Sequence, residues 1–218
     1  MGCESLKVGI IVGLEREKRL VPKKSNIFVE KGYGQKAYFV AKKLISKKID
    51  VLISFGLAKS ISKKIENTQI LIPKMTFDEE GKGLYTSKKY SSYFKKRIPF
   101  KIWDKNIITV SKVLNNKKNL KGKDIGGIDM ESHLIHRVAK ENKIKFTCIR
   151  IIFDDEQNPI PNFLIESLDE NGDPRFIKLT RKILEKPIRI KQLFELGFQY
   201  YKSKKILKRV AKKAFSNC

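Results

Sequence analysis

Five short runs of apolar, mostly β-branched residues recur along the chain and predict buried β-strands. They span residues 7–12, 51–55, 69–73, 106–110 and 146–153. Each run is apolar at consecutive positions, which is typical of strands that are covered on both faces in a mostly parallel sheet. We therefore expect such a sheet to form the core of the protein.

Between these runs the apolar positions follow helical spacing. In the segment 35–49, six apolar residues fall on one helical face and five lysines on the other. Strands that alternate with helices indicate an α/β fold in three layers, with a central mixed, mostly parallel sheet flanked by helices. Ligands of such folds bind beyond the carboxyl ends of the strands, so we expect the chemistry in the loops there.

The stretch "IDMESHLIHRVA" combines a helical pattern with two carboxylates. Met130, Leu134 and Val138 recur at i, i+4 and i+8, which predicts the buried stripe of a helix. Asp129 is its expected N-cap, and Glu131 falls in the first turn. The helix alone can explain both carboxylates, one as a cap and one as a counter-charge to the positive end of the helix dipole. The alternative is that they belong to a functional site.

The chain is strongly basic, with 48 Lys or Arg residues, 23 Asp or Glu residues and a formal net charge of +25. This charge predicts an anionic partner, or else lysines that only fill solvated positions. Nucleic acid is the less favoured partner, because the sequence has no zinc-finger spacing, aromatic RNP-like strand or helix-turn-helix pattern. An anionic membrane surface is the alternative.

The positive charge is concentrated near the end of the chain, where residues 178–213 contain thirteen Lys or Arg residues and two Glu residues. We expect two helices here, separated near Pro187. One face of the second helix carries four apolar residues, namely Ile206, Leu207, Val210 and Ala214. Basic residues surround this face, as in an amphipathic helix that lies on anionic lipid. We therefore divide the chain into a main domain, residues 1–170, and a basic helical extension packed on or beside it, residues 171–218.

The cysteines and the lengths of the apolar runs indicate the cellular compartment of the protein. Cys3, Cys148 and Cys218 are widely separated, which indicates reduced thiols and not a disulfide framework or a zinc site. No apolar run approaches the ~20 residues of a membrane-spanning helix, and we find no export signal. We expect a cytoplasmic protein, with peripheral attachment to the inner face of the membrane. His133 and His136 have no third ligand nearby, so we expect no metal, and no motif indicates a cofactor.

Several motifs together resemble the nucleoside phosphorylase and nucleosidase superfamily, over nearly the whole chain. They are "SFGLA", "DMESHLIHRVA", "IRIIFDD" and the segment "NPIPNFLIESLDENGDPRFIKLTRKILEKP". Within the superfamily they are most similar to bacterial hopanoid-associated phosphorylases, whereas methylthioadenosine/S-adenosylhomocysteine nucleosidases match only the shorter motifs. The resemblance implies a nucleoside phosphorylase-like fold and cleavage of the bond between adenine and a ribose that is attached to a hopane side chain. It also implies a homo-oligomer.

The resemblance implies that a carboxylic acid protonates the purine base as it departs. Cleavage of a C–N bond to a purine leaves a cationic sugar and an anionic base, and general acid catalysis of its departure is worth roughly 10² to 10⁴ in rate. The position that matches the family's acid is Asp154, which we expect to be desolvated next to Phe153. Asp155 follows it, and two carboxylates in a row can also indicate a solvated turn.

The resemblance also implies which residues bind the sugar and which residue positions the attacking water. Met130 and Glu131 match the family's Met-Glu pair, in which the methionine packs on the ribose and the glutamate accepts hydrogen bonds from its hydroxyl groups. Glu17 matches the carboxylate that positions or activates water, with Glu15 as the neighbour most easily confused with it. The alternative for this loop is a charged helix N-terminus. Arg150 is a candidate to anchor a carboxylate or to reach phosphate.

The strand motif departs from the family in one respect. Gly56 and Ala58 match the segment where the backbone approaches the purine, but Lys59 and Ser60 replace two glycines that the family usually has there. Losing the glycines restricts the backbone, which places the fit of the substrate in question. Lys59 is either a contact for an anion or a solvated side chain.

The co-substrate is water or phosphate, and we favour water because Glu17 would repel phosphate. Two other functions stay open at this point. One is a nucleosidase or purine nucleoside phosphorylase that acts on small soluble nucleosides. The other is a catalytically inactive protein of this fold that binds nucleotides or nucleic acid through its positive surface, with salt-sensitive binding.

Overall fold

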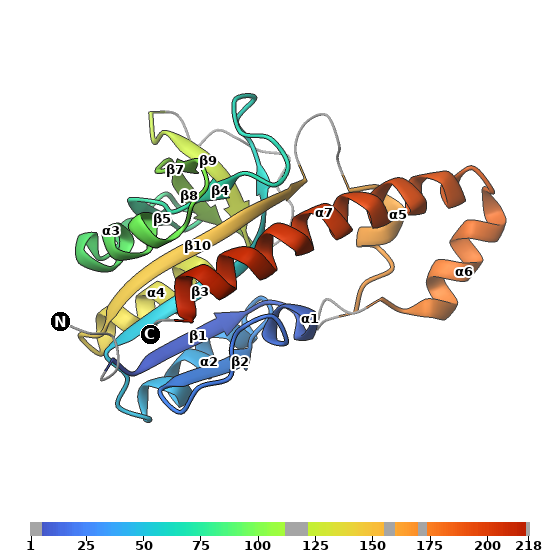
Figure 1. Cartoon of the computed structure of the whole chain (residues 1–218). Coiled ribbons are helices and arrows are strands. Elements are labelled where there is room, and N and C mark those ends of the chain that lie inside the picture. Colours follow the sequence, from blue (N-terminus) through green and yellow to red (C-terminus); the bar gives the residue numbers. More distant parts are fainter. Residues whose placement is uncertain (1–5, 112–121, 155–159, 170–173, 217–218) are drawn as a thin grey trace.

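The computed structural model describes residues 6–111, 122–154, 160–169 and 174–216. Two ten-residue strands, β3 (Val51–Ser60) and β10 (Lys145–Asp154), run parallel through its centre (Figure 1). On one side β3 pairs in parallel with β1 (Val8–Val12), which pairs in parallel with β2 (Ile27–Lys31). Of these four strands, β1, β3 and β10 correspond to apolar runs of the sequence, and all residues of β1 are buried.

The sheet continues through shorter strands beside the carboxyl halves of β3 and β10. The end of β3 pairs with β9 (Ile125–Asp129), followed by β8 (Asn106–Thr109), β5 (Met75–Phe77) and β6 (Gly83–Tyr85). On its other side β10 pairs with β4 (Ile70–Leu71), which pairs with β7 (Ile102–Trp103). Among the described strands, β3–β9, β4–β10 and β5–β6 are antiparallel and the other pairs are parallel. The sheet is therefore mixed and mostly parallel, as expected.

Alternate residues of the central strands face two separate layers of helices. One face packs against α2 (Lys36–Ile45) and α4 (Ser132–Glu141) through a core cluster that includes Ile11 and Leu52. The other packs against α3 (Lys88–Arg97) and α7 (Arg189–Phe215) through a cluster that includes Ile10 and Ile53. Burial on both faces is the physical reason for the continuously apolar runs, and the predicted three-layer α/β fold is confirmed.

Two predicted boundaries are wrong. The strand expected at residues 51–55 extends to Ser60, because its second half pairs with β9 and β10. The helix expected directly after Asp129, its predicted N-cap, begins at Ser132, because Asp129 is the last residue of β9 and pairs with Thr109.

This shift also changes which face of α4 is buried. Met130 and Leu134 of the expected stripe are only half-buried, whereas Ile135, Val138 and Ala139 are fully buried. The carboxylate of Asp129 nevertheless accepts the backbone N–H groups at 131 and 132, at 3.3 and 3.2 Å. It therefore serves the start of the helix from the end of a strand.

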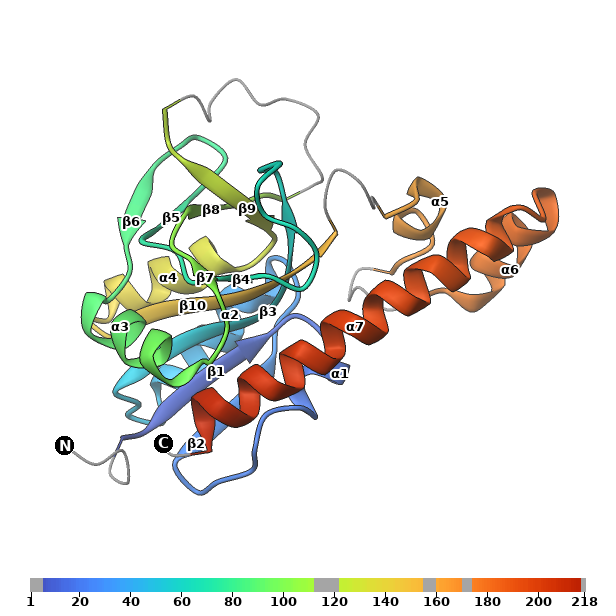
Figure 2. The same ribbon diagram turned by 45° about the horizontal axis from the view of Figure 1, so that its top comes forward.

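The two helices expected near the end of the chain are α6 (Phe176–Glu185) and α7, and the break between them includes Pro187. The face of α7 assigned to lipid is wrong, because Leu207, Val210 and Ala214 are at most 2% exposed and Ile206 is partly buried in the same cluster. They pack on the sheet together with Phe55 and Phe94. The first half of α7 extends beyond the sheet beside α6 and α5 (Asn162–Ile165) (Figure 2).

Candidate active site

Arg150, in the middle of β10, is the centre of a buried polar cluster. Its Nη2 lies 2.8 Å from Oδ2 of Asp129 and 3.2 Å from Oε2 of Glu131. The same nitrogen donates to the hydroxyl groups of Ser54 at 2.7 Å and Ser132 at 3.1 Å. All five side chains are buried. The guanidinium group is thus held by protein groups, and it fixes two carboxylates in place.

Glu17 brings a third carboxylate to this cluster from α1 (Glu15–Lys18), the short helix that follows β1. Its Oε2 accepts the backbone N–H of Leu14 at 3.0 Å, and its Oε1 accepts that of Leu57 in β3 at 3.0 Å. The side chain is 2% exposed, whereas Glu15 is exposed to solvent. Of the two carboxylates in the first loop, Glu17 is therefore the one that faces the cluster.

The glycine turn before α2 reaches the Met-Glu pair. Oε1 of Glu131 accepts the backbone N–H of Gly34 at 3.3 Å, and the Tyr33 hydroxyl donates to Sδ of Met130 at 3.3 Å. Gly34 has a φ of 53°, in the left-handed region that favours glycine. The turn therefore holds both residues of the pair next to the cluster.

Gly56 allows the charged groups to meet, and Gly13 lies beside two of the carboxylates. A Cβ atom on Gly56 would lie 2.8 Å from both Nη1 of Arg150 and Oε1 of Glu17, closer than a side chain tolerates. A Cβ atom on Gly13 would lie 3.6 Å from Oε1 of Glu131 and 3.7 Å from Oε2 of Glu17. The carboxylates of Glu17 and Glu131 therefore border the same point above Gly13, although they come from distant parts of the chain.

The cluster contains three carboxylates and one guanidinium group, and this excess of negative charge has consequences for protonation. Burial raises the pKa of Glu17, while Arg150 and the backbone N–H groups oppose the shift. Burial also raises the pKa of Glu131 to about 7, against Arg150 and with the help of Asp129. Burial raises the pKa of the neighbouring Cys148 to about 12, so it stays a thiol. The site therefore favours a positively charged group above the carboxylates.

A second polar group lies farther along the same two strands. Asp154, the last residue of β10, is 4% exposed, and its Oδ2 lies 2.9 Å from Nζ of Lys59 in β3. The side chain of Lys59 is one-third exposed. Lys59 is two residues beyond Leu57, which contacts Glu17, so the two groups are about 7 Å apart along the strand.

Phe153 and Ala58 flank this second group. The ring of Phe153 is half-buried and meets the ring of Tyr200 on α7 edge to face, with centroids 6.1 Å apart. The Phe153 carbonyl accepts a hydrogen bond from the side chain of Asn67. Ala58 is buried in β3 and pairs with β10. The aromatic contact ties the site to the extended helix α7.

The structure brings together the residues selected from the sequence in two neighbouring groups. Glu17, Met130, Glu131, Arg150 and Gly56 meet at one, and Asp154, Phe153 and Ala58 lie at the other. Lys59 does not point to solvent alone, because it pairs with Asp154. Asp155 lies outside the described residues.

Sequence reasoning missed Ser54 and Ser132, and it did not connect Asp129 with Arg150. Asp129 carried a signal as a carboxylate beside Glu131, whereas the two serines carried none.

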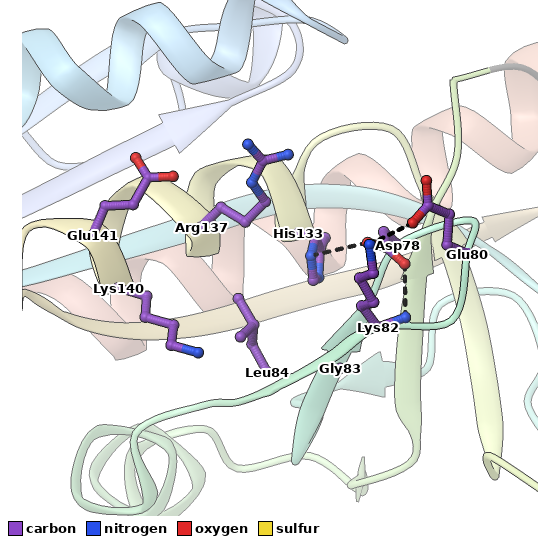
Figure 3. Close-up of a pocket in the computed structure, with 9 residues that line it drawn as sticks. All are labelled: Asp78, Glu80, Lys82, Gly83, Leu84, His133, Arg137, Lys140 and Glu141. Carbon is purple, nitrogen blue, oxygen red and sulfur yellow. Dashed lines mark hydrogen bonds and ion pairs between the residues drawn. The ribbon is translucent and has the colours of Figure 1, made fainter.

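His133 and His136 are buried on α4 and both hydrogen-bond to Thr76. His133 also borders a hollow of about 490 Å³ between α4 and the β5–β6 turn. There its ring lies 3.8 Å from Oδ2 of Asp78, and Lys82 pairs with Glu80 (Figure 3). In the described part of the chain, no group of three or more His, Cys, Asp or Glu residues is arranged as metal ligands.

The arrangement of strands and helices is that of known nucleosidases. A methylthioadenosine/S-adenosylhomocysteine nucleosidase from Neisseria meningitidis, in complex with methylthio-immucillin-A, superimposes with a TM-score of 0.66 and 14% identity, covering 95% of this chain and 99% of the other. Futalosine hydrolase from Helicobacter pylori gives 0.65 and 14%, covering 95% and 97%. A nucleosidase of the first type from Colwellia psychrerythraea, in complex with adenine, gives 0.65 and 13%, covering 98% and 93%.

These similarities are at the level of the fold. No protein-family model and no curated protein matches the sequence. At 13–14% identity the solved structures define the class of fold, a three-layer α/β fold shared with nucleosidases, over nearly the whole chain. The chemistry must be argued from the residues themselves.

Proposed function

We propose that this protein is an enzyme that hydrolyses the N-glycosidic bond of an adenine nucleoside. The observation that carries the proposal is the placement of a buried, negatively charged cluster next to a second carboxylate on the same pair of strands. Glu17 and Glu131 would face the sugar, and Asp154 would face the base, about 7 Å away along β3 and β10. The nucleosidase fold supports the same assignment.

At the sugar end, the cluster would stabilise the positive charge that develops on the ribose. As the bond between the sugar and the base breaks, its electron pair leaves with the base and the ribosyl carbon becomes cationic. Glu131, fixed by Arg150 at 3.2 Å and by Gly34 at 3.3 Å, accepts hydrogen bonds from the ribose hydroxyl groups. Glu17 takes a proton from the water whose oxygen bonds to that carbon.

At the base end, a proton must reach the purine as it departs. The pair formed by Asp154 and Lys59 carries an ammonium proton 2.9 Å from a carboxylate oxygen. Lys59 would give its ammonium proton to the Asp154 carboxylate, Asp154 would pass that proton to the imidazole nitrogen of the base, and solvent water would then reprotonate Lys59. The contact between Lys59 and Asp154 supports this role for Lys59.

Water is favoured over phosphate as the co-substrate. A phosphorylase needs cationic groups that are available to the anion. The guanidinium group of Arg150 is instead bound to Asp129, Glu131 and two serine hydroxyl groups. Three neighbouring carboxylates would also repel phosphate.

For the substrate we propose an adenosyl lipid, adenosylhopane, whose release of adenine belongs to hopanoid lipid synthesis. The support is the resemblance of residues 158–187 to hopanoid-associated phosphorylases, together with a basic surface suited to anionic membranes. The protein would then be cytoplasmic and peripheral on the inner face of the membrane. A second candidate is a small thio-nucleoside, favoured by the fold of nucleosidases that act on methylthioadenosine.

The test is release of adenine from adenosylhopane and from methylthioadenosine by purified protein. We expect Asp154→Asn to lower the rate by roughly 10² to 10⁴, with Asp124→Asn, an exposed aspartate on the surface, as the matched control. Faster turnover of methylthioadenosine would favour the second candidate. No adenine from either substrate would contradict the proposal, and would favour a binding protein.

A further inference from the structure

The helix α6 and the first half of α7 project from the three-layer core (Figures 1 and 2). We name the segment 176–202 the arm. No residue of α6 is buried, and the first buried residue of α7 is Ser203. By contrast α2, which is as long as α6, buries three residues against the sheet. The arm is therefore not part of the core that the rest of α7 completes.

Large apolar side chains are exposed on this arm. On α7, the four residues Ile190, Phe194, Phe198 and Tyr201 are 47 to 76% exposed, and their spacing of i, i+4, i+8 and i+11 places them on one helical face. Four more lie on α6 and in the connection: Phe176, Ile177, Leu184 and Ile188. Of the eleven exposed large apolar residues in the described chain, eight thus belong to the arm. Such a concentration is typical of an interaction surface.

The charge around this surface determines its partner. Residues 175–202 contain eight Lys or Arg residues and two Glu residues. Lys191 follows Ile190 on the helix, and Nζ of Lys202 lies 4.3 Å from the centre of the Phe198 ring. The arm of a second copy would bring the same excess of Lys and Arg to this surface, so like charges would face each other. An anionic lipid surface satisfies both the apolar face and its basic border.

The base of the arm adjoins the candidate site. Tyr200 meets Phe153, the neighbour of Asp154, and the Arg16 guanidinium lies 5.9 Å from the centre of the Tyr200 ring. Arg16 precedes Glu17 on α1. A surface that binds the arm would therefore lie near both ends of the site.

We propose that the arm is a docking surface for anionic lipid bilayers, with Phe194 and Phe198 entering the interface and the lysines remaining at the headgroups. No helix in the described residues has the length and apolar content needed to cross a bilayer. The purpose of the docking rests on the proposed lipid substrate, but the docking itself is measured without any substrate.

The test is sedimentation with vesicles of phosphatidylcholine, alone or mixed with phosphatidylglycerol. We expect binding to the mixed vesicles, and we expect F194Q/F198Q to weaken it about 10- to 100-fold through loss of apolar burial. The matched control is F39Q, since Phe39 is 70% exposed on α2, outside the arm. Equal binding to both kinds of vesicle, or an equal loss in F39Q, would overturn the proposal.

Two charge variants test whether binding depends on the lysines of the arm or only on the net positive charge of the protein. K191Q/K202Q should reduce binding to the mixed vesicles more than K88Q/K96Q, which removes two exposed lysines of α3. Equal losses would show that only net charge matters and would overturn the inference. A dimer that F194Q/F198Q dissociates in analytical ultracentrifugation, without vesicle binding, would assign the surface to a second copy instead.

The proposed function and the docking fail separately. We expect F194Q/F198Q to release adenine from a soluble nucleoside at the wild-type rate. Vesicle binding without any adenine release would overturn the function and leave the docking standing. Adenine release without vesicle binding would overturn the docking and leave the proposed function standing.

Discussion

The two ends of the candidate site differ in how they are built. The sugar end is a closed network in which Glu17, Glu131 and Arg150 are all at most 5% exposed. The base end is a single ion pair in which Lys59 is one-third exposed. A buried network keeps its geometry whether or not a substrate is present, whereas a pair that borders solvent can rearrange. We infer that the sugar end is preorganised and that the base end adapts when the purine arrives.

Removal of Arg150 should have the largest effect, because it would break the sugar end. R150M leaves three buried carboxylates without a cation, which we expect to cost roughly 3–5 kcal/mol of unfolding free energy. Chemical denaturation followed by circular dichroism measures this loss. The matched control is R137M, since Arg137 is exposed on α4. If both variants are equally stable, the network does not hold the site together.

Substitution of Asp154 should separate chemistry from stability. D154N breaks an ion pair with a partly exposed partner, so we expect a change in the unfolding free energy of about 1 kcal/mol or less. The same variant should lose most of the release of adenine. Thermal melts of the variant and of wild type, run beside the activity assay, make this comparison. A stability loss as large as that of R150M would show that the base end is structural too.

The pH dependence of kcat/KM should reflect the ionisation of Glu131, whose pKa is raised to about 7. Glu131 must be ionised to accept the ribose hydroxyl groups, so kcat/KM should fall up to about tenfold per pH unit below pH 7. In E131Q the protein should be less active throughout, and this part of the profile should disappear. An unchanged profile in E131Q would assign the titration to another group.

The same shift predicts the pH dependence of stability. The pKa of Glu131 is higher in the folded protein than its ordinary value of 4.5, so the folded state binds more protons between about pH 4.5 and 7. The contribution of Glu131 to stability is therefore fully present below pH 4.5 and is lost as the pH rises through 7. Denaturation of wild type and E131Q across this range measures the contribution. A difference that grows in the opposite direction would contradict the assignment.

Substitution of Lys59 should have the smallest effect on stability. K59M removes one side of an ion pair near the surface, for which we expect about 0–1 kcal/mol. If Lys59 restores the proton of Asp154, K59M should lower kcat more than it raises KM. A variant with full kcat would show that Lys59 only neutralises charge in the free protein.

Much of the fold could be predicted from the sequence, because continuously apolar strands and one-sided helices reflect burial directly. The strands at residues 7–12 and 146–153 were placed within one residue of β1 and β10. The prediction failed where pairing decides the structure. Residues 56–60 contain a lysine and a serine, and they remain in a strand only because β9 and β10 pair with them.

Prediction of the site was limited in the same way, by contacts that form only when distant segments pair. The resemblance to the nucleosidase superfamily selected Glu17, Glu131 and Asp154 as candidates, because they match the positions of the family's carboxylates. The role of Arg150 stayed open, since a residue inside a strand reveals its partners only once β9 and α4 are placed beside it. The second half of α7 shows the opposite error. A stripe of apolar residues in a basic helix indicated lipid contact, but the chosen stripe completes the core and a different one is exposed.

The most direct test of the account is the release of adenine in phosphate-free buffer by wild type and by E17Q. We predict that wild type releases adenine without phosphate, and that E17Q is slower by roughly 10² to 10⁴. Release that requires phosphate, or an E17Q variant as active as wild type, would contradict hydrolysis at this site.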